Sequence, residues 1–222
     1  MMIEEVRHLN RGYVASSVRL ADGVVTALGW AVAQAQGHWD GVNLSAATVR
    51  ILHDSSILEE ARAHGLQLTG AQLRTARHLV PGPVVICTPD LKSVAEAEEI
   101  RQATAIVVVG AHPGLKAWVG AFRPERLAGA AIPVPDRVVD DPEVWAAMET
   151  FTDLINSGTG LTHPCDRSLV TDGLLELHRT GHPFDPDELM AAAFKLNWRG
   201  TAAWDLRVLA TELNAEQLNA DN

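Results

Sequence analysis

Short, uninterrupted apolar runs that alternate with helical patterns constrain this chain most strongly. Residues 84–88 and 105–109 are almost entirely apolar, without the alternation expected of a sheet that has one solvent-exposed face. Both runs therefore predict strands buried on both faces, and residues 48–54 predict a third strand. Such strands separated by helices are typical of a parallel sheet with helices on both sides.

Helix-capping residues follow two of these predicted strands. Ser56 with Glu59, and Ser93 with Glu96, each form the S-x-x-E pattern of a helix start. Another helix is expected at residues 71–79, because a Pro-Gly-Pro turn comes directly after it. The chain thus contains repeated units of strand followed by helix.

The segments at either end of this region are harder to assign. Residues 17–36 have apolar side chains at helical spacing and predict an N-terminal helix over one sheet face, capped by Ser16 or Ser17. Residues 37–45 are rich in turn formers. Residues 131–134 predict a last strand, which its prolines restrict to a sheet edge.

Strand patterns disappear in the C-terminal part, where helices are expected. Asp141 and Asp185 are each followed by proline, the combination of a helix cap and a first helical residue. Further helices are predicted at residues 168–179 and 201–213, with a frayed tail at 214–222.

Together these patterns predict an α/β fold with two parts. Residues 1–135 should hold a small, mostly parallel Rossmann-like sheet of three or four strands, flanked by helices. Residues 136–222 should form an α-helical subdomain.

Charge limits the classes of partner. The chain has a formal net charge of -10, and residues 126–222 contain 7 Lys and Arg against 16 Asp and Glu. This balance disfavours nucleic acid and membrane surfaces as partners. The acidic half is predicted to be an interaction surface for basic partners, with a solvated acidic face as the alternative.

Targeting signals and cysteines bear on the compartment. The chain has two cysteines, too few for a disulfide framework, and no basic start followed by an apolar stretch. No apolar run approaches the ~18 residues of a membrane span. We therefore expect a cytoplasmic protein, and the excess of Arg over Lys suggests a bacterial genome.

Polar residues follow each predicted strand, where parallel α/β folds bind their ligands. The candidate ligand-binding residues are Asp54, Ser55 and Ser56 after the first strand, Thr88 and Asp90 after the second, and Gly110 and His112 after the third. Helix capping alone also selects Ser and Asp at such positions, so capping is the alternative. The sequence lacks a G-x-G-x-x-G motif and identifies no cofactor.

Four residues in the C-terminal half have a spacing that suggests a metal site. His163, Cys165, His178 and His182 form the pattern H-x-C-x12-H-x3-H, which contains the second half of a zinc-finger spacing. The first half is tighter than the usual C-x2-C or C-x4-C hairpin. The alternative is a loop histidine, a semi-buried cysteine and two polar residues at a helix end.

Residues 49–60 resemble the opening strand of PIN-type metal-dependent nucleases, in which an aspartate after an apolar strand helps to hold divalent cations. The resemblance implies Asp54 and Glu96 as metal carboxylates, completed by Asp166 or Asp172. Metal-dependent phosphodiester hydrolysis by carboxylates at the strand ends is therefore the alternative function. The acidic balance of the chain opposes it.

Trp198 and Arg199 lie between two predicted helices and are candidates for a docking surface, with core packing as the alternative. Taken together, the sequence predicts a cytoplasmic bacterial protein that binds a small molecule or another protein. It does not decide whether the protein is an enzyme, and a homo-oligomer is compatible with it.

Overall fold

The computed structural model describes residues 9–46, 63, 67–69, 79–156 and 159–220. Its internal contacts divide the chain into two compact units. We call residues 1–115 with 123–133 the sheet unit, and residues 116–122 with 134–222 the helical unit.

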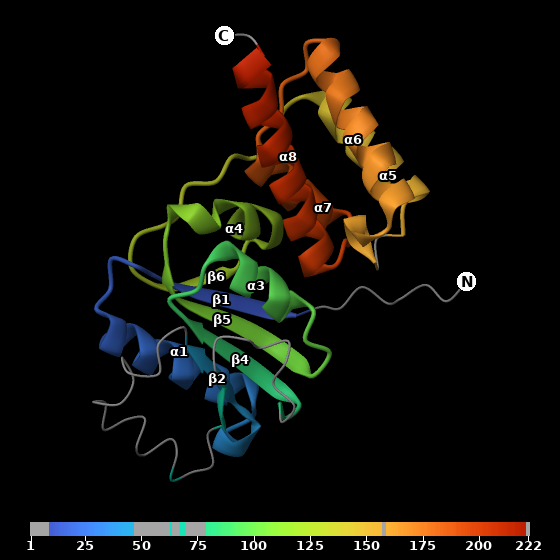
Figure 1. Ribbon diagram of the computed structural model, residues 1–222. Coiled ribbons are helices and arrows are strands. Elements are labelled where there is room, and N and C mark those ends of the chain that lie inside the picture. The colour runs from blue at the N-terminus through green and yellow to red at the C-terminus, as the bar shows by residue number, and fades with distance from the viewer. Residues whose placement is uncertain (1–8, 47–62, 64–66, 70–78, 157–158, 221–222) are drawn as a thin grey trace. The chain divides into compact units, whose positions relative to one another are not determined.

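Parallel strands form the sheet unit (Figure 1). In the described residues the sheet has six strands, in the order β3-β2-β4-β5-β1-β6, and every pairing is parallel. Their bounds are β1 Asn10–Ala15, β2 Asn43–Ala46, β3 Gln67–Thr69, β4 Gly82–Cys87, β5 Ala103–Ala111 and β6 Glu125–Ala128. This arrangement confirms the predicted α/β fold with a parallel sheet and a helical C-terminal region, but the predicted number of three or four strands is wrong, because β1, β2 and β6 were not recognised.

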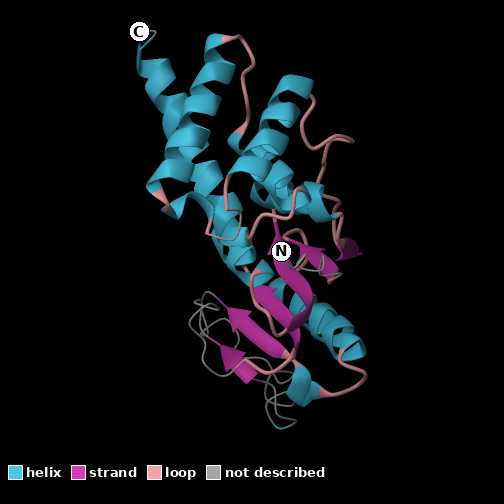
Figure 2. Ribbon diagram, turned by 90° about the vertical axis from the view of Figure 1, so that its right-hand side faces the viewer, coloured by secondary structure: helices cyan, strands magenta, loops and turns pink. Residues whose placement is uncertain are grey.

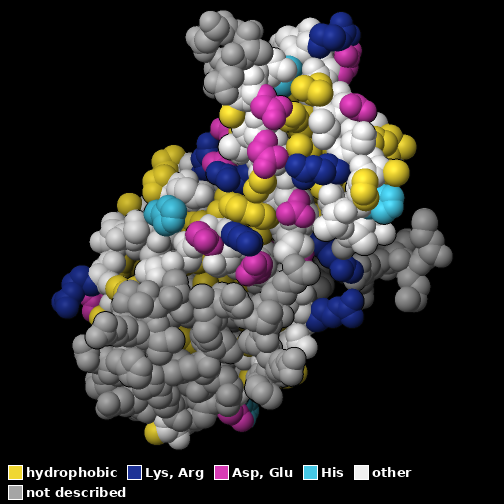
Figure 3. All heavy atoms as spheres, in the orientation of Figure 1, with side chains coloured by type: hydrophobic (Ala, Val, Ile, Leu, Met, Phe, Trp, Pro, Cys, Tyr) yellow, Lys and Arg dark blue, Asp and Glu magenta, His cyan; other side chains and the backbone are white. Residues whose placement is uncertain are grey.

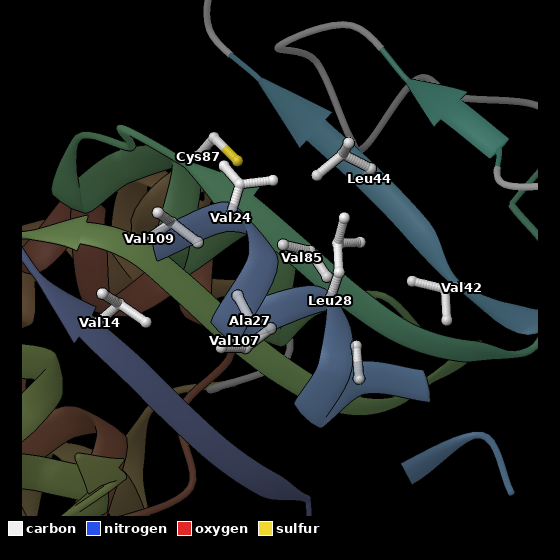
Figure 4. Close-up of a cluster of buried hydrophobic side chains, with 11 residues drawn as sticks. Val14, Val24, Ala27, Leu28, Val42, Leu44, Val85, Cys87, Val107 and Val109 are labelled. Atoms are coloured by element: carbon white, nitrogen blue, oxygen red, sulfur yellow. The ribbon is translucent and has the colours of Figure 1, made fainter. Parts of the chain in front are cut away.

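Helices cover both faces of the sheet. Helix α1 (Leu20–Gln34) packs against β1, β4 and β5, where Leu28, Val85 and Val107 belong to one buried aliphatic cluster (Figure 4). Helix α3 (Leu91–Glu98) packs against β5 on the other face (Figure 1). Alternate residues of β4 and β5 therefore meet different helices, which explains why residues 84–87 and 105–109 are apolar throughout.

Gly23 lies where the backbone of α1 comes close to the sheet. A Cβ on Gly23 would lie 3.0 Å from Val109 Cγ1 and 3.2 Å from Val14 Cγ1. The glycine lowers helix propensity, but it lets the helix backbone approach the sheet closely. The exposed Gly29 has no such neighbour, because its Cβ would meet nothing within 4 Å.

Proline-initiated helices dominate the helical unit (Figure 2). Its helices are α4 Lys116–Phe122, α5 Pro142–Leu154, α6 Pro164–Arg179, α7 Pro186–Lys195 and α8 Gly200–Ala220. The side chains of Asp141, His163 and Asp185 accept hydrogen bonds from backbone N–H groups at the starts of α5, α6 and α7. Helix α7 packs against α4 and α8, and α5 packs against α6.

Three short 3₁₀ segments complete the described elements: η1 Trp39–Gly41, η4 Pro113–Leu115 and η5 Gly160–Thr162. Within the part of the chain that the structure describes, no helix combines the length and apolarity that a membrane crossing needs.

Several predicted elements are wrong. The chain has an N-terminal strand, β1, that the sequence did not reveal, and β2 occupies residues predicted to be turns. Residues 131–134 form no strand, since β6 takes the sheet edge instead. Helix α8 continues to Ala220, through residues predicted to fray. The strand at 48–54 and the helix after Ser56 lie outside the described residues, as does nearly all of the helix at 71–79.

Candidate functional site

The carboxyl ends of three neighbouring strands form the candidate site in the sheet unit. Strand β5 lies between β4 and β1, with Cys87 opposite Val109 and Ala15 opposite Ala111. The residues that follow these strands therefore emerge side by side at one edge of the sheet (Figure 1). Thr88 and His112, two of the residues proposed from sequence, are among them, and Gly110, a third, is the penultimate residue of β5.

Thr88 has an unusual backbone conformation. Its φ of 48° lies in the left-handed region, which a β-branched residue rarely adopts, and its N–H donates to Val109 O at 2.8 Å. Gly110 on the neighbouring strand has a φ of 82°, and a Cβ there would lie 3.4 Å from Thr88 Cγ2. Backbone strain of this kind costs about 1–3 kcal/mol and clusters at ligand-binding sites.

His112 is exposed at the end of β5. Its Nδ1 accepts a hydrogen bond from the N–H of Gly114 at 3.1 Å, so the neutral ring carries its hydrogen on Nε2. A Cβ on Gly114 would lie only 2.7 Å from His112 Cε1, which shows how closely the ring sits over this glycine. The imidazole is thus held by its own loop and has a donor available to a ligand.

The end of β1 adds residues that the sequence did not assign to a site. The N–H of Ser16 donates to Ala111 O at 2.7 Å, which places the start of this loop against β5. Ser17 Oγ does not cap α1 but accepts from the N–H of Ala130 at 3.0 Å. The N-cap of α1 is instead Arg19, whose side chain makes no capping hydrogen bond.

The connections around β5 lead to opposite faces of the sheet. The chain passes from β1 into α1 on one face, and from β4 into α3 on the other (Figure 1). In open α/β sheets, ligands bind at such reversals, outside the carboxyl ends of the strands. The order of the strands therefore favours the same edge that the loop residues occupy.

Asp90, in contrast, has a structural role. Its Oδ1 accepts hydrogen bonds from the N–H of Ser93 at 2.7 Å and from Ser93 Oγ at 2.6 Å. Asp90 is therefore the cap of α3, and the prediction that Ser93 caps this helix is wrong. Asp54, Ser55 and Ser56 lie outside the described residues.

A thiolate nucleophile is not available at the end of β4. Burial raises the pKa of Cys87 to about 12, so its thiol stays protonated at neutral pH. The neighbouring groups are a hydroxyl, an imidazole, backbone N–H groups and the exposed guanidinium of Arg19. This set is suited to binding through hydrogen bonds and charge.

The four candidate zinc ligands have other partners or remain separate. His163 Nδ1 accepts from the N–H of Cys165 at 3.3 Å, and the thiol of Cys165 is exposed. His178 Nε2 lies 2.9 Å from Asn214 Oδ1, and His182 Nδ1 lies 2.9 Å from Asp141 Oδ2. Over the described ranges, no three His, Cys, Asp or Glu side chains are grouped to hold a metal ion.

Apart from Asp54, the carboxylates that the nuclease resemblance implies as metal ligands lie in different units. Glu96 lies on α3 in the sheet unit, whereas Asp166 and Asp172 lie on α6 in the helical unit.

Trp198 is a core residue, so the predicted docking role of its ring is not supported. Only 4% of this residue is exposed, and its Nε1 donates to Thr152 Oγ1 at 2.7 Å. In the turn after α7, the backbone N–H of Trp198 donates a hydrogen bond to Ala193 O. Arg199 remains exposed.

Comparison with known proteins leaves the activity open. Residues 140–218, about a third of the chain and all within the helical unit, match the model of a domain of unknown function, DUF1889. Neither the curated proteins nor the solved structures contain a match to this chain.

Proposed function

We propose that the protein binds a small anionic molecule at the carboxyl edge of its sheet. The strand-end site consists of Ser16, Arg19, Thr88, Gly110 and His112. The observation that carries the proposal is the left-handed backbone of Thr88, next to the left-handed Gly110. Strain at a β-branched residue persists only where its surroundings impose it, and ligand sites are where such strain is commonly retained.

The chemistry of the surrounding groups favours an anion. Arg19 is exposed, with its Nε 4.0 Å from the exposed carboxylate of Asp22, His112 offers an N–H, and the first turn of α1 has no side-chain cap. A phosphate or carboxylate accepts hydrogen bonds from donors of this kind, and the positive end of a helix dipole favours its charge. Among the described residues that directly follow β4, Asp90 carries a carboxylate, and its Oδ1 already accepts hydrogen bonds from the N–H and the Oγ of Ser93.

Binding without catalysis is the simplest role for these groups. The alternative, metal-dependent phosphodiester hydrolysis, stays a prediction because Asp54 lies outside the described residues. A basic protein partner for the acidic helical unit, the bacterial origin and the cytoplasmic location likewise stay predictions from sequence. We propose no cofactor.

NMR titration of the full chain with inorganic phosphate, and separately with adenosine monophosphate, tests the proposal. We expect saturable shifts of the backbone amides at Ser16, Arg19, Gly110 and His112. Replacing Arg19 by Gln should weaken binding about tenfold, the scale of one lost charged hydrogen bond. Arg101→Gln, before β5 at the opposite end of the strand, removes the same charge and should leave binding unchanged. Shifts spread over the surface, or equal effects of both substitutions, would contradict the proposal.

A second test separates functional strain from ordinary backbone strain. Thr88→Gly should stabilise the sheet unit, because glycine adopts the left-handed region freely. It should also weaken ligand binding, because the site loses the hydroxyl of Thr88. Gln36→Gly is the matched control, since Gln36 has a φ of 55° after α1, outside the loops of the strand-end site. It should stabilise the unit without changing affinity. Unchanged affinity in Thr88→Gly would remove the observation on which the proposal rests.

A further inference from the structure

A pocket within the helical unit is independent of the strand-end site. It has a cavity volume of about 50 Å³ and lies between α4, α7 and residues 135–138. All of its lining residues belong to the helical unit. From the sequence, Asp185 is predicted only to start a helix, and no ligand-binding residue is predicted in this region.

Small and apolar side chains form the walls of this pocket. Ala117 and Gly120 line it from α4, Ala191 lines it from α7, and Val138 contributes from the connecting segment. Small residues on two packed helices leave space between them that larger side chains would fill. The walls therefore suit a short hydrocarbon chain.

The carboxylates of Asp185 and Asp187 at the start of α7 form ion pairs with Lys116 on α4 and Arg207 on α8. Lys116 Nζ lies 3.0 Å from Asp185 Oδ2 and 3.6 Å from Asp187 Oδ2. Arg207 Nε donates to Asp187 Oδ1 at 2.6 Å. Two cations thus neutralise two carboxylates.

Glu188, which lines the pocket, has no such partner. Among the described residues its carboxylate makes no hydrogen bond and no ion pair. Burial, together with the charges of Asp185 and Asp140, raises the pKa of Glu188, although Lys116 acts in the opposite direction. An ionised Glu188 is therefore a negative charge without a hydrogen-bonded partner, which Lys116 offsets only at a distance.

We infer that this pocket binds a small organic monocation, a primary ammonium carried on a short alkyl chain. Glu188 accepts hydrogen bonds from the ammonium, and the alkyl chain lies against Ala117, Gly120 and Ala191. A metal ion fits less well, because among the described residues no three His, Cys, Asp or Glu side chains are grouped to hold one, and Asp187 is already paired with Arg207. The inference does not depend on the proposed function, since the two sites lie in different units.

NMR titration of the full chain with n-butylammonium chloride at neutral pH tests the inference. We expect saturable amide shifts at Ala117, Gly120, Glu188 and Ala191. n-Butanol, the neutral analogue, should produce no saturable shifts, and sodium chloride at the same concentration controls for ionic strength. Equal binding of butanol would overturn the assignment of a cation, as would the same shifts with sodium chloride.

Single substitutions test whether butylammonium binds at Glu188 in this pocket. Glu188→Gln should weaken butylammonium binding at least about tenfold, because a charged hydrogen bond is lost. Glu149→Gln, an exposed carboxylate on α5 outside the pocket, should leave affinity unchanged. Ala191→Met should also weaken binding by filling the pocket, with circular dichroism verifying that the variant folds. Unchanged affinity in Glu188→Gln would overturn the inference.

A protein partner could present the same ammonium on a lysine side chain. N-acetyl-lysine methylamide is the probe for this source. Weaker binding than butylammonium supports a free small molecule, because the blocked backbone adds bulk that the pocket does not accommodate. Tighter binding would overturn the small-molecule assignment and indicate a basic protein segment.

Discussion

The sheet unit and the helical unit use charged residues in different ways. In the sheet unit, Arg11 on β1 pairs with Glu98 on α3 through two hydrogen bonds of 2.9 and 2.8 Å, and the side chains are only 14% and 7% exposed. In the helical unit, Arg167 pairs with Glu212 at 3.1 Å with side chains 45% and 55% exposed. The first pair belongs to the packing of its unit, whereas the second lies on a surface.

Net charge follows the same division. The sheet unit contains 11 Lys and Arg against 12 Asp and Glu, while the helical unit contains 7 against 16. On the face drawn in Figure 3, carboxylates lie beside basic side chains over the C-terminal helices. The comparison teaches that the sheet unit is nearly neutral and contains a largely buried ion pair, whereas the helical unit carries the excess negative charge of the chain.

The largest expected effect comes from breaking the buried pair. Glu98→Ala should destabilise the sheet unit by about 3–5 kcal/mol, because Arg11 is left partly buried without its counter-ion. Glu212→Ala should destabilise the helical unit by less than about 1 kcal/mol, since its pair is exposed. Urea unfolding combined with amide hydrogen exchange measures each unit separately. Equal losses in the two variants would refute the division between structural and surface charge.

Substitution of helical glycines by alanine tests how tightly the helices of each unit are packed. A Cβ on Gly173 in α6 would lie 2.5 Å from Phe151 Cε1, so Gly173→Ala should destabilise the helical unit by about 1–3 kcal/mol. Gly23→Ala in α1 should be close to neutral, because contact with Val109 offsets its gain in helix propensity. Gly29→Ala meets no neighbour and should stabilise the sheet unit by about 1 kcal/mol. Thermal unfolding measures all three, and a stabilising Gly173→Ala would contradict this order.

Acid should weaken the helical unit. A hydrogen bond from His182 and the N–H of Glu143 lower the pKa of Asp141 below its ordinary value of 3.8. Burial opposes ionisation of Asp185, but N–H groups at the start of α7 and Lys116 outweigh it and lower its pKa also. Both groups stabilise the folded state above their unfolded pKa, and this stability disappears as pH falls through the folded pKa.

Hydrogen exchange in the helical unit between about pH 5 and about pH 2 measures this loss. Asp141→Asn keeps a side chain that can cap α5 but removes its titration, so the variant should lose less stability in acid than the native chain. An identical acid dependence of the two proteins would contradict the role of Asp141.

The smallest effect concerns Glu188. Its raised pKa destabilises the folded state above the folded pKa, and this penalty vanishes below the ordinary value of 4.5. Glu188→Gln should therefore stabilise the helical unit at neutral pH by at most about 1 kcal/mol, the scale of partly exposed charges. The gain should be absent in acid, and Glu149→Gln should show none. A destabilised Glu188→Gln at neutral pH would mean that the carboxylate has a partner in the fold.

The sequence by itself determined the features that depend on neighbours along the chain. Asp141 and Asp185 cap α5 and α7 as predicted, because a cap and its N–H partners lie within one helical turn. The apolar runs of β4 and β5 predicted burial on both faces, since no residue in them alternates toward solvent. Thr88, Gly110 and His112 were proposed because they lie at or directly after the ends of the apolar runs.

Only the tertiary structure decided which distant segments meet. Strand β1 is short and gave no clear pattern, yet it lies between β5 and β6 and brings Ser16 to the strand-end site. For Trp198 the sequence left a docking surface and core packing open, because its burial depends on packing with the distant α5, where Thr152 accepts its indole N–H. Strand order, burial and pockets arise from contacts between remote segments, which local spacing does not encode, whereas caps and strand periodicity are satisfied within a few residues.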